Sequence, residues 1–399
     1  MDNFIKDPAL NHNNVTSNAE DMPSSLIEFD RTNNSDIGKM AFCFLISIIL
    51  VIAAFLRLHY LDVPPIWMDE AFTYHVAKQP IQLILFGHLD NHPPLFYAVQ
   101  HLWWSFVPAS RFLRVPAAVF GVGMVLVVGL AAADLASRRA GIMAAALVAL
   151  STGNIYMSQD ARMYTLVSLG VALAGWGLAG LNDKTSYRWS YSLLYLFGGV
   201  IAIYSQVIGL ICLFAINVTV LISAVQQRSH SFYRPWILSN LALLILSAPW
   251  FFALTEAVGT FPGEKRYALS LLPWFFLNMV GFPGLPGGIK QSANILLVVG
   301  AVLGAYILWS RRRRGLAMIG LGLLLAYPVL IALINSKVPV LVNRVFLPCE
   351  IGIALLAASG IAALERPWVR IFGAVVLLTR PIHDGGGFAL SSRAAELSA

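Results

Sequence analysis

Two adjacent acids, Asp69 and Glu70, stand out in a chain that has few charged residues. They lie in the stretch "WMDEAFTYH", which follows a long apolar run and the Pro64-Pro65 step. A carboxylate in this place could accept a proton from a hydroxyl group and act as a general base. Helix capping and solvation are the structural alternative for such a pair. Because ionisable residues at membrane depth are costly and usually mark substrate or ion paths, we favour the chemical interpretation.

Two more polar groups have residue types that suit chemistry with phosphates. Asp160 and Arg162 lie in "YMSQDARMYTL" between two apolar segments, and Arg344 lies in "LVNRVFLP" before another. An arginine offers a planar fork of donors that matches a phosphate group. A base and such cations would suit a reaction in which a hydroxyl is activated and a phosphate group leaves. A salt-bridged hairpin and a snorkelling arginine are the structural alternatives.

Composition indicates what kind of protein positions these residues. Of the 399 residues, 58% are hydrophobic and 12% are charged, and the mean hydropathy is +0.72. Soluble domains have about 25% charged residues, so we predict an all-α polytopic membrane protein. The net charge of +7 is explained by basic residues in cytoplasmic loops. We therefore expect membrane lipids, and no nucleic acid, as partners.

Apolar runs predict about 10–11 transmembrane helices, each of about 17–25 residues. The segment 94–108 is shorter and contains the Trp103-Trp104 pair, which suits a helix that lies along the membrane interface. The segment 369–380 is a weaker candidate span. The other candidates are 40–58, 115–134, 141–158, 163–181, 190–206, 208–225, 237–255, 293–310, 315–335 and 346–364.

The distribution of basic residues predicts the orientation in the membrane. If 94–108 lies along the surface and the N-terminus is inside, nearly every short basic cluster falls on the cytoplasmic side. The acids and arginines considered above then share the outer face. We expect a disordered cytoplasmic tail over 1–39, a transmembrane domain over 40–379 whose first outer loop is 57–114, and an irregular, truncated tail over 380–399. The expected location is the inner (plasma) membrane, with the site facing the periplasm or the exterior.

Four motifs, in this order along the chain, resemble the C-type glycosyltransferases. They are "R-L-x-Y-L … P-x-W-x-D-E-A-F", "N-H-P-P-L-F-Y", "S-Q-D-A-R-M-Y" and "N-R-V-F-L-P", and the resemblance covers roughly residues 40 to 365. The nearest branch is the bacterial one, similar to protein O-mannosyltransferases and aminoarabinose transferases. The resemblance implies an enzyme that moves a sugar from a polyprenyl-phosphate-linked donor on the outer face. Its acceptor stays open among a lipid, a glycan and a protein.

The same resemblance assigns roles to the first acids and to three arginines. By match of motif, Asp69 is the catalytic base and Glu70 supports it. Arg344 would bind the donor phosphate, and Arg57 and Arg162 are further candidates for that role.

The resemblance also raises the question of a metal ion. Asp160 corresponds to an acid that helps to hold a metal ion or the acceptor, and His92 lies beside it as a ligand or hydrogen-bond donor. Relatives often have a histidine where this chain has Gln206, which is a poorer metal ligand. A divalent metal ion therefore stays an open expectation.

Two other classes of function compete with this interpretation. A polytopic transporter or lipid-linked sugar flippase could use outer acids and arginines as a translocation path. Against it, the sequence shows no internal repeat, and its charges cluster at one face instead of the membrane midplane. An inactive scaffold is the third alternative, because of Gln206 and the short C-terminus.

Overall fold

The computed structural model describes residues 37–87, 89–90, 92–184, 188–257, 267–281 and 287–364, and all regular secondary structure in these ranges is helical. The prediction of an all-α protein is thereby confirmed. The expected tails and the candidate span 369–380 lie outside the described residues, apart from the last few positions of the N-terminal segment.

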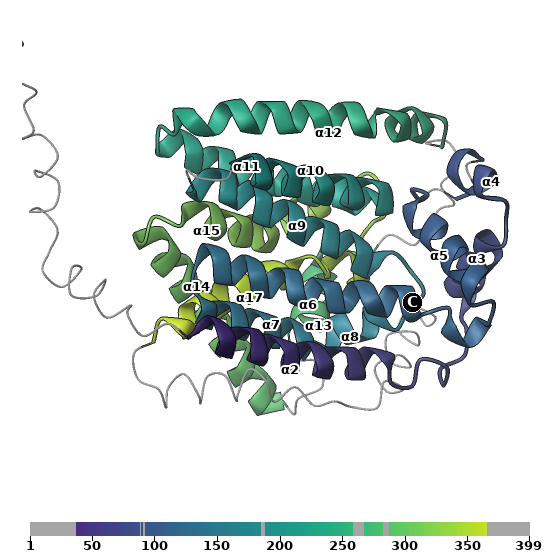
Figure 1. The fold of residues 1–399 in the computed structure, drawn as a ribbon, viewed down its shortest axis with the longest axis horizontal. Coiled ribbons are helices and arrows are strands. Elements are labelled where there is room, and N and C mark those ends of the chain that lie inside the picture. The colour runs from purple at the N-terminus through teal and green to yellow at the C-terminus, as the bar shows by residue number, and fades with distance from the viewer. Residues whose placement is uncertain are drawn as a thin grey trace, which may run out of the picture. The chain divides into compact units, whose positions relative to one another are not determined.

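The helices run in a bundle whose members lie mostly side by side (Figure 1). Their bounds are α2 (Lys39–Leu58), α3 (Met68–Ala77), α4 (Ile81–Phe86), α5 (Leu95–Phe106), η3 (Ser110–Phe112), α6 (Val115–Leu135), α7 (Arg138–Ala149), α8 (Thr152–Ser158), α9 (Tyr164–Asp183), α10 (Arg188–Ser205), α11 (Val207–Gln226), α12 (His230–Ala257), η4 (Leu269–Leu271), α13 (Leu272–Val280), α14 (Gly287–Ser310), α15 (Arg314–Leu321), η5 (Gly322–Ala326), α16 (Tyr327–Asn335), η6 (Asn343–Phe346) and α17 (Cys349–Ala362).

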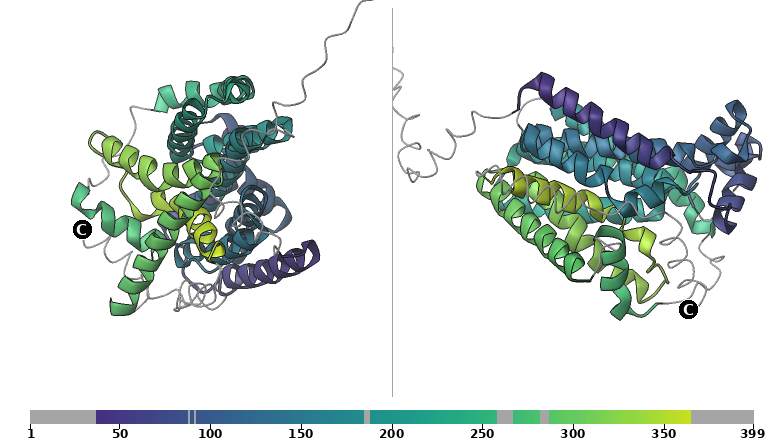
Figure 2. Two further views of the ribbon diagram at one scale, coloured as in Figure 1. Left: turned by 90° about the vertical axis from the view of Figure 1, so that its left-hand side faces the viewer. Right: turned by 90° about the horizontal axis from the view of Figure 1, so that it is seen from below.

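Seven helical segments of the described chain are long and apolar enough to cross a membrane, or eight if the bent pair α7 and α8 counts as one span. This makes the chain a multi-pass membrane protein. The segments predicted as spans at 190–206 and 237–255 form α10 and α12, which are not among the seven. In α10 the reason is composition, because three serines and three tyrosines reduce its hydropathy. Figure 2 shows α2 at the edge of the bundle in both views, while α17 is almost wholly buried.

The helices α3, α4 and α5 form a group at one end of the bundle (Figure 1). At about 1.5 Å per residue, the 12 residues of α5 extend about 18 Å, too short for a bilayer core of about 30 Å. The ring of Tyr74 on α3 meets Trp104 on α5 edge to face at 4.9 Å between centroids, and His101 bonds to the carbonyl of Ala77. The first loop is therefore a packed helical layer. That α5 lies along the membrane interface stays a prediction.

The basic turns lie at the other end of the bundle. The helix α9 is 20 residues long, so its last residue is about 30 Å from its first. There Lys184 is 3.4 Å from Asp134 at the end of α6. Asp183 accepts hydrogen bonds from the amides of Gly315 and Leu316 at the start of α15, at 2.7 and 3.0 Å. The separation of basic turns from the first loop is the one that the charge pattern predicts.

Candidate active site

The first acidic pair lies in the first turn of α3. The two prolines before Trp67 favour an extended chain, and Trp67 is the N-cap residue. Asp69 therefore does not cap the helix. Its carboxylate projects from the helix and is about a quarter exposed, at 24%, whereas Glu70 is buried, at 1%. The two neighbours thus have different environments.

Glu70 forms a buried ion pair with Arg114. Its two carboxylate oxygens each lie 2.6 Å from a guanidinium nitrogen, so the contact is bidentate. Arg114 also donates to the carbonyls of Pro64 and Pro65, at 2.9 and 3.1 Å. A buried charge pair with its remaining donors satisfied holds its geometry. Glu70 consequently anchors the start of α3, and its carboxylate is not available to substrate.

The turn that carries Asp160 is bound directly to this anchor. The amide of Ala161 donates to Glu70 Oε1 at 3.0 Å, and Trp67 Nε1 donates to Asp160 Oδ1 at 3.1 Å. The second outer turn is therefore fixed against the first loop at two points. The prediction that Asp69 and Asp160 share one end of the bundle is consistent with these contacts.

Arg344 lies against Asp69. Its Nη1 is 3.2 Å from Asp69 Oδ2, and both side chains are 24% exposed. The guanidinium carbon also lies 5.8 Å from the centroid of the Trp67 ring and 5.6 Å from that of Tyr164. These faces attract a cation, so the arginine is held at the surface of the site while part of it stays accessible.

The segment before Arg344 is itself fixed by hydrogen bonds. Asn335 Oδ1 accepts from the amides of Val340 and Leu341, each at 3.1 Å. Tyr327 donates its hydroxyl to the carbonyl of Val345 at 2.6 Å. Pro348 then precedes α17. The short helix η6 therefore presents Arg344 from a rigid base.

Arg162 occupies the inner side of the site and is only 5% exposed. Its Nη1 donates to Tyr97 at 3.2 Å, to the hydroxyl of Thr73 at 3.3 Å and to the carbonyl of Asp69 at 3.5 Å. Tyr97 in turn donates to Asp90. Arg162 thus supplies positive charge beside the Asp69–Arg344 pair and connects the turn to α3 and α5.

Two titratable groups at this end have strongly shifted pKa values. Burial raises the pKa of Asp160 to about 7, and the charge of Glu70 adds to the effect, while the bond from Trp67 opposes it. Burial lowers the pKa of His92 to about 4, with the charges of Arg162 and Arg344 acting in the same direction. At neutral pH, Asp160 is therefore partly protonated and His92 is a neutral imidazole.

Two of the sequence-predicted residues have hydrogen bonds elsewhere. Arg57 is fully buried and donates to the carbonyls of Val148 and Ala149 and to Asn154. Gln206 lies at the turn between α10 and α11, where its backbone N–H donates to the carbonyl of Ala202. None of the hydrogen bonds described for either residue involves Asp69, Asp160 or Arg344.

The side chains described here do not fit a metal ion. Within the described ranges, no three His, Cys, Asp or Glu side chains are grouped so that they could hold one. Glu70 is engaged by Arg114, and Asp69 faces Arg344.

Sequence reasoning missed Arg114, Trp67 and Tyr97 as members of the site. Trp67 and Tyr97 lie inside the motifs "WMDEAF" and "NHPPLFY", so their positions within those motifs were the available signal. Arg114 lies outside both motifs at the start of an apolar run, where a basic residue is common for reasons of orientation.

Comparisons with solved structures identify the fold. No protein-family model matches the sequence, and no curated protein matches it. The structure is similar to that of ArnT from Cupriavidus metallidurans, with a TM-score of 0.62 and 12% identity over 90% of this chain and 69% of ArnT. The same protein bound to undecaprenyl phosphate matches with a TM-score of 0.61 and 11% identity over 90% and 70%.

An archaeal protein is also similar. The oligosaccharyltransferase AglB from Archaeoglobus fulgidus, in complex with an inhibitory peptide and a dolichol-phosphate, has a TM-score of 0.53 and 13% identity over 90% of this chain and 56% of AglB. The chain therefore has the fold of the C-type glycosyltransferases, as its motifs predict. Among the structures named here, ArnT gives the higher TM-scores and the fuller coverage.

Proposed function

We propose that this protein is a membrane glycosyltransferase that moves a sugar from a polyprenyl-phosphate donor to a lipid, glycan or protein acceptor. The observation that carries the proposal is the contact between Asp69 and Arg344 at one end of the bundle, at 3.2 Å. A carboxylate and a guanidinium, both partly exposed, are the two groups that such a transfer needs. The fold and the lipid phosphates named for ArnT and AglB support this reading.

The reaction follows from the placement of these groups. The oxygen of the acceptor hydroxyl attacks the anomeric carbon, and its proton passes to the Asp69 carboxylate. The bond from that carbon to the phosphate oxygen breaks, and its electron pair leaves with the lipid phosphate. Arg344, with Arg162 behind it, stabilises the charge that develops there. Because the attacking oxygen and the leaving phosphate lie on opposite sides of the anomeric carbon, the contact between Asp69 and Arg344 must open before transfer.

The ion pair also suggests how the donor prepares the base. In the described structure the guanidinium of Arg344 forms an ion pair with the carboxylate of Asp69. A partly exposed ion pair contributes less to stability than its geometry suggests, so a lipid phosphate can take over the guanidinium. Asp69 is then released to accept a proton only when the donor is present.

The other residues have supporting roles in this proposal. Glu70 holds the start of α3 through Arg114. Asp160 and the neutral His92 line the same end and can bond to sugar or acceptor hydroxyls. In this proposal Arg344 and Arg162, which lie beside Asp69, bind the donor phosphate. Arg57 does not have that role.

The proposed location is the inner (plasma) membrane, with the N-terminus in the cytoplasm and the site facing the periplasm or exterior. The support is the gathering of basic turns, such as that of Lys184, at the end opposite to Asp69. Basic loops stay on the cytoplasmic side of a membrane. The acidic end then faces outward.

Mass spectrometry of co-purified lipid tests the proposal. The protein is extracted in mild detergent, and lipids that remain bound are identified. A polyprenyl phosphate or its sugar derivative is expected in the wild type, with less in Arg344→Ala. Recovery of only bulk phospholipid in both proteins, together with transport of a solute in vesicles, would support the transporter alternative instead.

A further inference from the structure

Four buried polar residues lie inside the bundle and take no part in the proposed chemistry. They are Arg57 on α2, Ser151 before α8, Asn154 on α8 and Glu350 on α17, and we call them the bend cluster. Each is at most 2% exposed. Charged groups in such surroundings are costly unless they are paired, so their presence needs a reason.

The first reason is the bend between α7 and α8. These helices meet at an angle of 60°, so the last carbonyls of α7 lack the regular amide donors of a continuous helix, although the Val148 carbonyl still accepts from the amide of Ser151 at 3.3 Å. Arg57 donates to two of them, to Ala149 at 3.0 Å and to Val148 at 2.9 Å. A cation at a helix C-terminus is favourable. Arg57 therefore caps α7 from the neighbouring helix.

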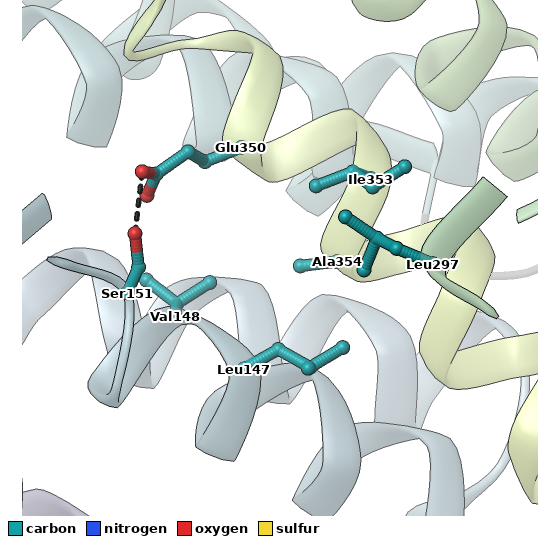
Figure 3. Close-up of a pocket in the computed structure, with 7 residues that line it drawn as sticks. All are labelled: Leu147, Val148, Ser151, Leu297, Glu350, Ile353 and Ala354. Atoms are coloured by element: carbon teal, nitrogen blue, oxygen red, sulfur yellow. Dashed lines mark hydrogen bonds between the residues drawn. The ribbon is translucent and has the colours of Figure 1, made fainter. Parts of the chain in front are cut away.

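The start of α8, on the other side of the bend, is also held by side-chain hydrogen bonds. Arg57 Nη2 donates to Asn154 Oδ1 at 2.8 Å, and Ser151 Oγ accepts from the amide of Asn154 at 3.2 Å. The Ser151 hydroxyl donates to Glu350, and Figure 3 shows these two side chains pointing toward one another. Beside them is a cavity of about 10 Å³, otherwise lined by apolar side chains such as Leu147 and Leu297.

Each helix of the bend cluster leads directly to a part of the active site. The helix α2 precedes the loop to Asp69, α8 precedes Asp160, and α17 follows the η6 segment that carries Arg344. The side chain of Gln159 adds a second link, because its amide donates to the carbonyl of Leu56 at 3.1 Å and to that of His59 at 3.0 Å. The three segments that carry the site residues are thus also held together inside the bundle, away from the site itself.

We infer that Arg57 and Glu350 are positioning residues, which set the 159–163 turn against the Asp69–Arg344 pair. The inference rests on the proposed function for its effect on turnover, but not for its structural part. It also gives Arg57 a role different from that of a phosphate ligand. Both side chains act through their hydrogen bonds at the bend, Arg57 as a donor and Glu350 as an acceptor, and neither touches the reacting atoms.

A purely structural role makes a different prediction. Replacing a buried ion pair by apolar residues of similar size is often neutral or stabilising, whereas removing one partner alone is destabilising. Arg57 and Glu350 are buried opposite charges that interact electrostatically and are linked by hydrogen bonds through Asn154 and Ser151. If they only neutralise each other, the double variant Arg57→Met/Glu350→Met should regain the behaviour of the wild type. If they position the turn, the double variant regains thermal stability but loses the bonds from Arg57 to the α7 carbonyls and from Ser151 to Glu350.

The test is amide hydrogen exchange in the purified protein without substrate. The variants are Glu350→Met, the double variant, the conservative Glu350→Gln and Ser151→Ala. The control is Ser359→Ala, because Ser359 is buried on the same helix as Glu350 and bonds within that helix to the carbonyl of Leu355. Peptides that cover residues 158–164 should exchange about tenfold faster in Glu350→Met, in the double variant and in Ser151→Ala. Glu350→Gln, which keeps an acceptor for Ser151, should stay near the wild type.

Kinetics with a polyprenyl-phosphate sugar provide the second readout. We expect kcat to fall about tenfold in the double variant while KM for the donor stays within about twofold, because misplacement affects the transition state more than binding. Wild-type exchange and kcat in the double variant would overturn the inference. If Glu350→Met does not fold, Ser151→Ala is the deciding variant. Equal amide exchange over residues 158–164 in Ser151→Ala and Ser359→Ala would then overturn the inference. Absence of transfer in the wild type would contradict the proposed function alone, because hydrogen exchange needs no sugar.

Discussion

The carboxylate of Asp69 lies 3.2 Å from the guanidinium of Arg344, although 275 residues separate the two in the chain. The pair joins the first loop to the segment before α17. Glu70, the immediate neighbour of Asp69, is instead engaged by Arg114. Adjacent acids therefore have separate duties, and this difference can be measured.

Asp69→Asn should abolish transfer and leave the fold intact. The amide keeps the size of the side chain and can still face Arg344, but it cannot accept the proton of the acceptor. Loss of a general base typically lowers the rate by about 10²–10⁴-fold. Turnover is measured in membranes at matched expression, together with the melting temperature of the purified protein.

Glu70→Gln is the matched comparison and should behave in the opposite way. It leaves the buried Arg114 charge without its carboxylate, which costs on the order of 3–5 kcal/mol. We expect a clearly lower melting temperature and a smaller effect on turnover per folded molecule. A hundredfold loss in Glu70→Gln with normal turnover in Asp69→Asn would transfer the base role to Glu70.

Arg344→Lys should retain folding but weaken use of the donor. Lysine keeps the charge and can lie over the same aromatic rings, yet it lacks the two-pronged geometry that matches a phosphate. Because the interaction strengthens as the phosphate leaves, kcat should fall as well as donor affinity. Steady-state kinetics over a range of donor concentrations measure both. An unchanged rate and donor dependence would remove Arg344 from the site and make Arg162 the phosphate ligand to test.

Asp160 should make thermal stability depend on pH. Its folded pKa of about 7 lies above the ordinary 3.8, so the folded protein holds a proton that the unfolded chain releases between these values. The stability from this group is present below about pH 4 and is lost as the pH rises through about 7. Melting temperatures should therefore fall between about pH 5 and pH 8 in the wild type, and less so in Asp160→Asn. If the melting temperature depends equally on pH in the two proteins, the raised pKa of the buried Asp160 carboxyl would be contradicted.

Gly121→Ala should destabilise the bundle next to Arg57. A Cβ atom at Gly121 would lie 2.0 Å from Ser158 Oγ and 3.1 Å from Arg57 Nε. Overpacking of this kind costs about 1–3 kcal/mol. Gly123→Ala on the same helix is the control, since its Cβ would meet its nearest neighbour, Leu169, at an ordinary 3.4 Å. Melting temperatures of the two variants should differ, and equal values would show that the contact relaxes freely.

The sequence predicted the membrane class and most of the chemical groups, for identifiable reasons. Apolar runs are direct signals of spans, and the motifs around Asp69, Asp160 and Arg344 identified residues that the structure places at one end of the bundle. Their mutual contacts could not be predicted, because helix packing decides which loops meet.

Arg57 shows most clearly where sequence reasoning stops. Its position at the end of the first apolar run suggested the membrane surface, and 141–158 was predicted to be one span. The structure has a 60° bend in that span, and the bend exposes carbonyl groups that draw the guanidinium inward. A local break in helical hydrogen bonding thus changed the environment of a distant arginine.

The most direct test of the central claim is release of polyprenyl phosphate in vesicles. Wild-type protein and Asp69→Asn are reconstituted with polyprenyl-phosphate sugars and supplied with membranes from cells that lack the protein as the source of acceptor. The account predicts release of polyprenyl phosphate and appearance of a glycosylated product with the wild type, and neither with Asp69→Asn. Movement of intact sugar lipid across the vesicle membrane, without cleavage of the sugar–phosphate bond, would contradict it.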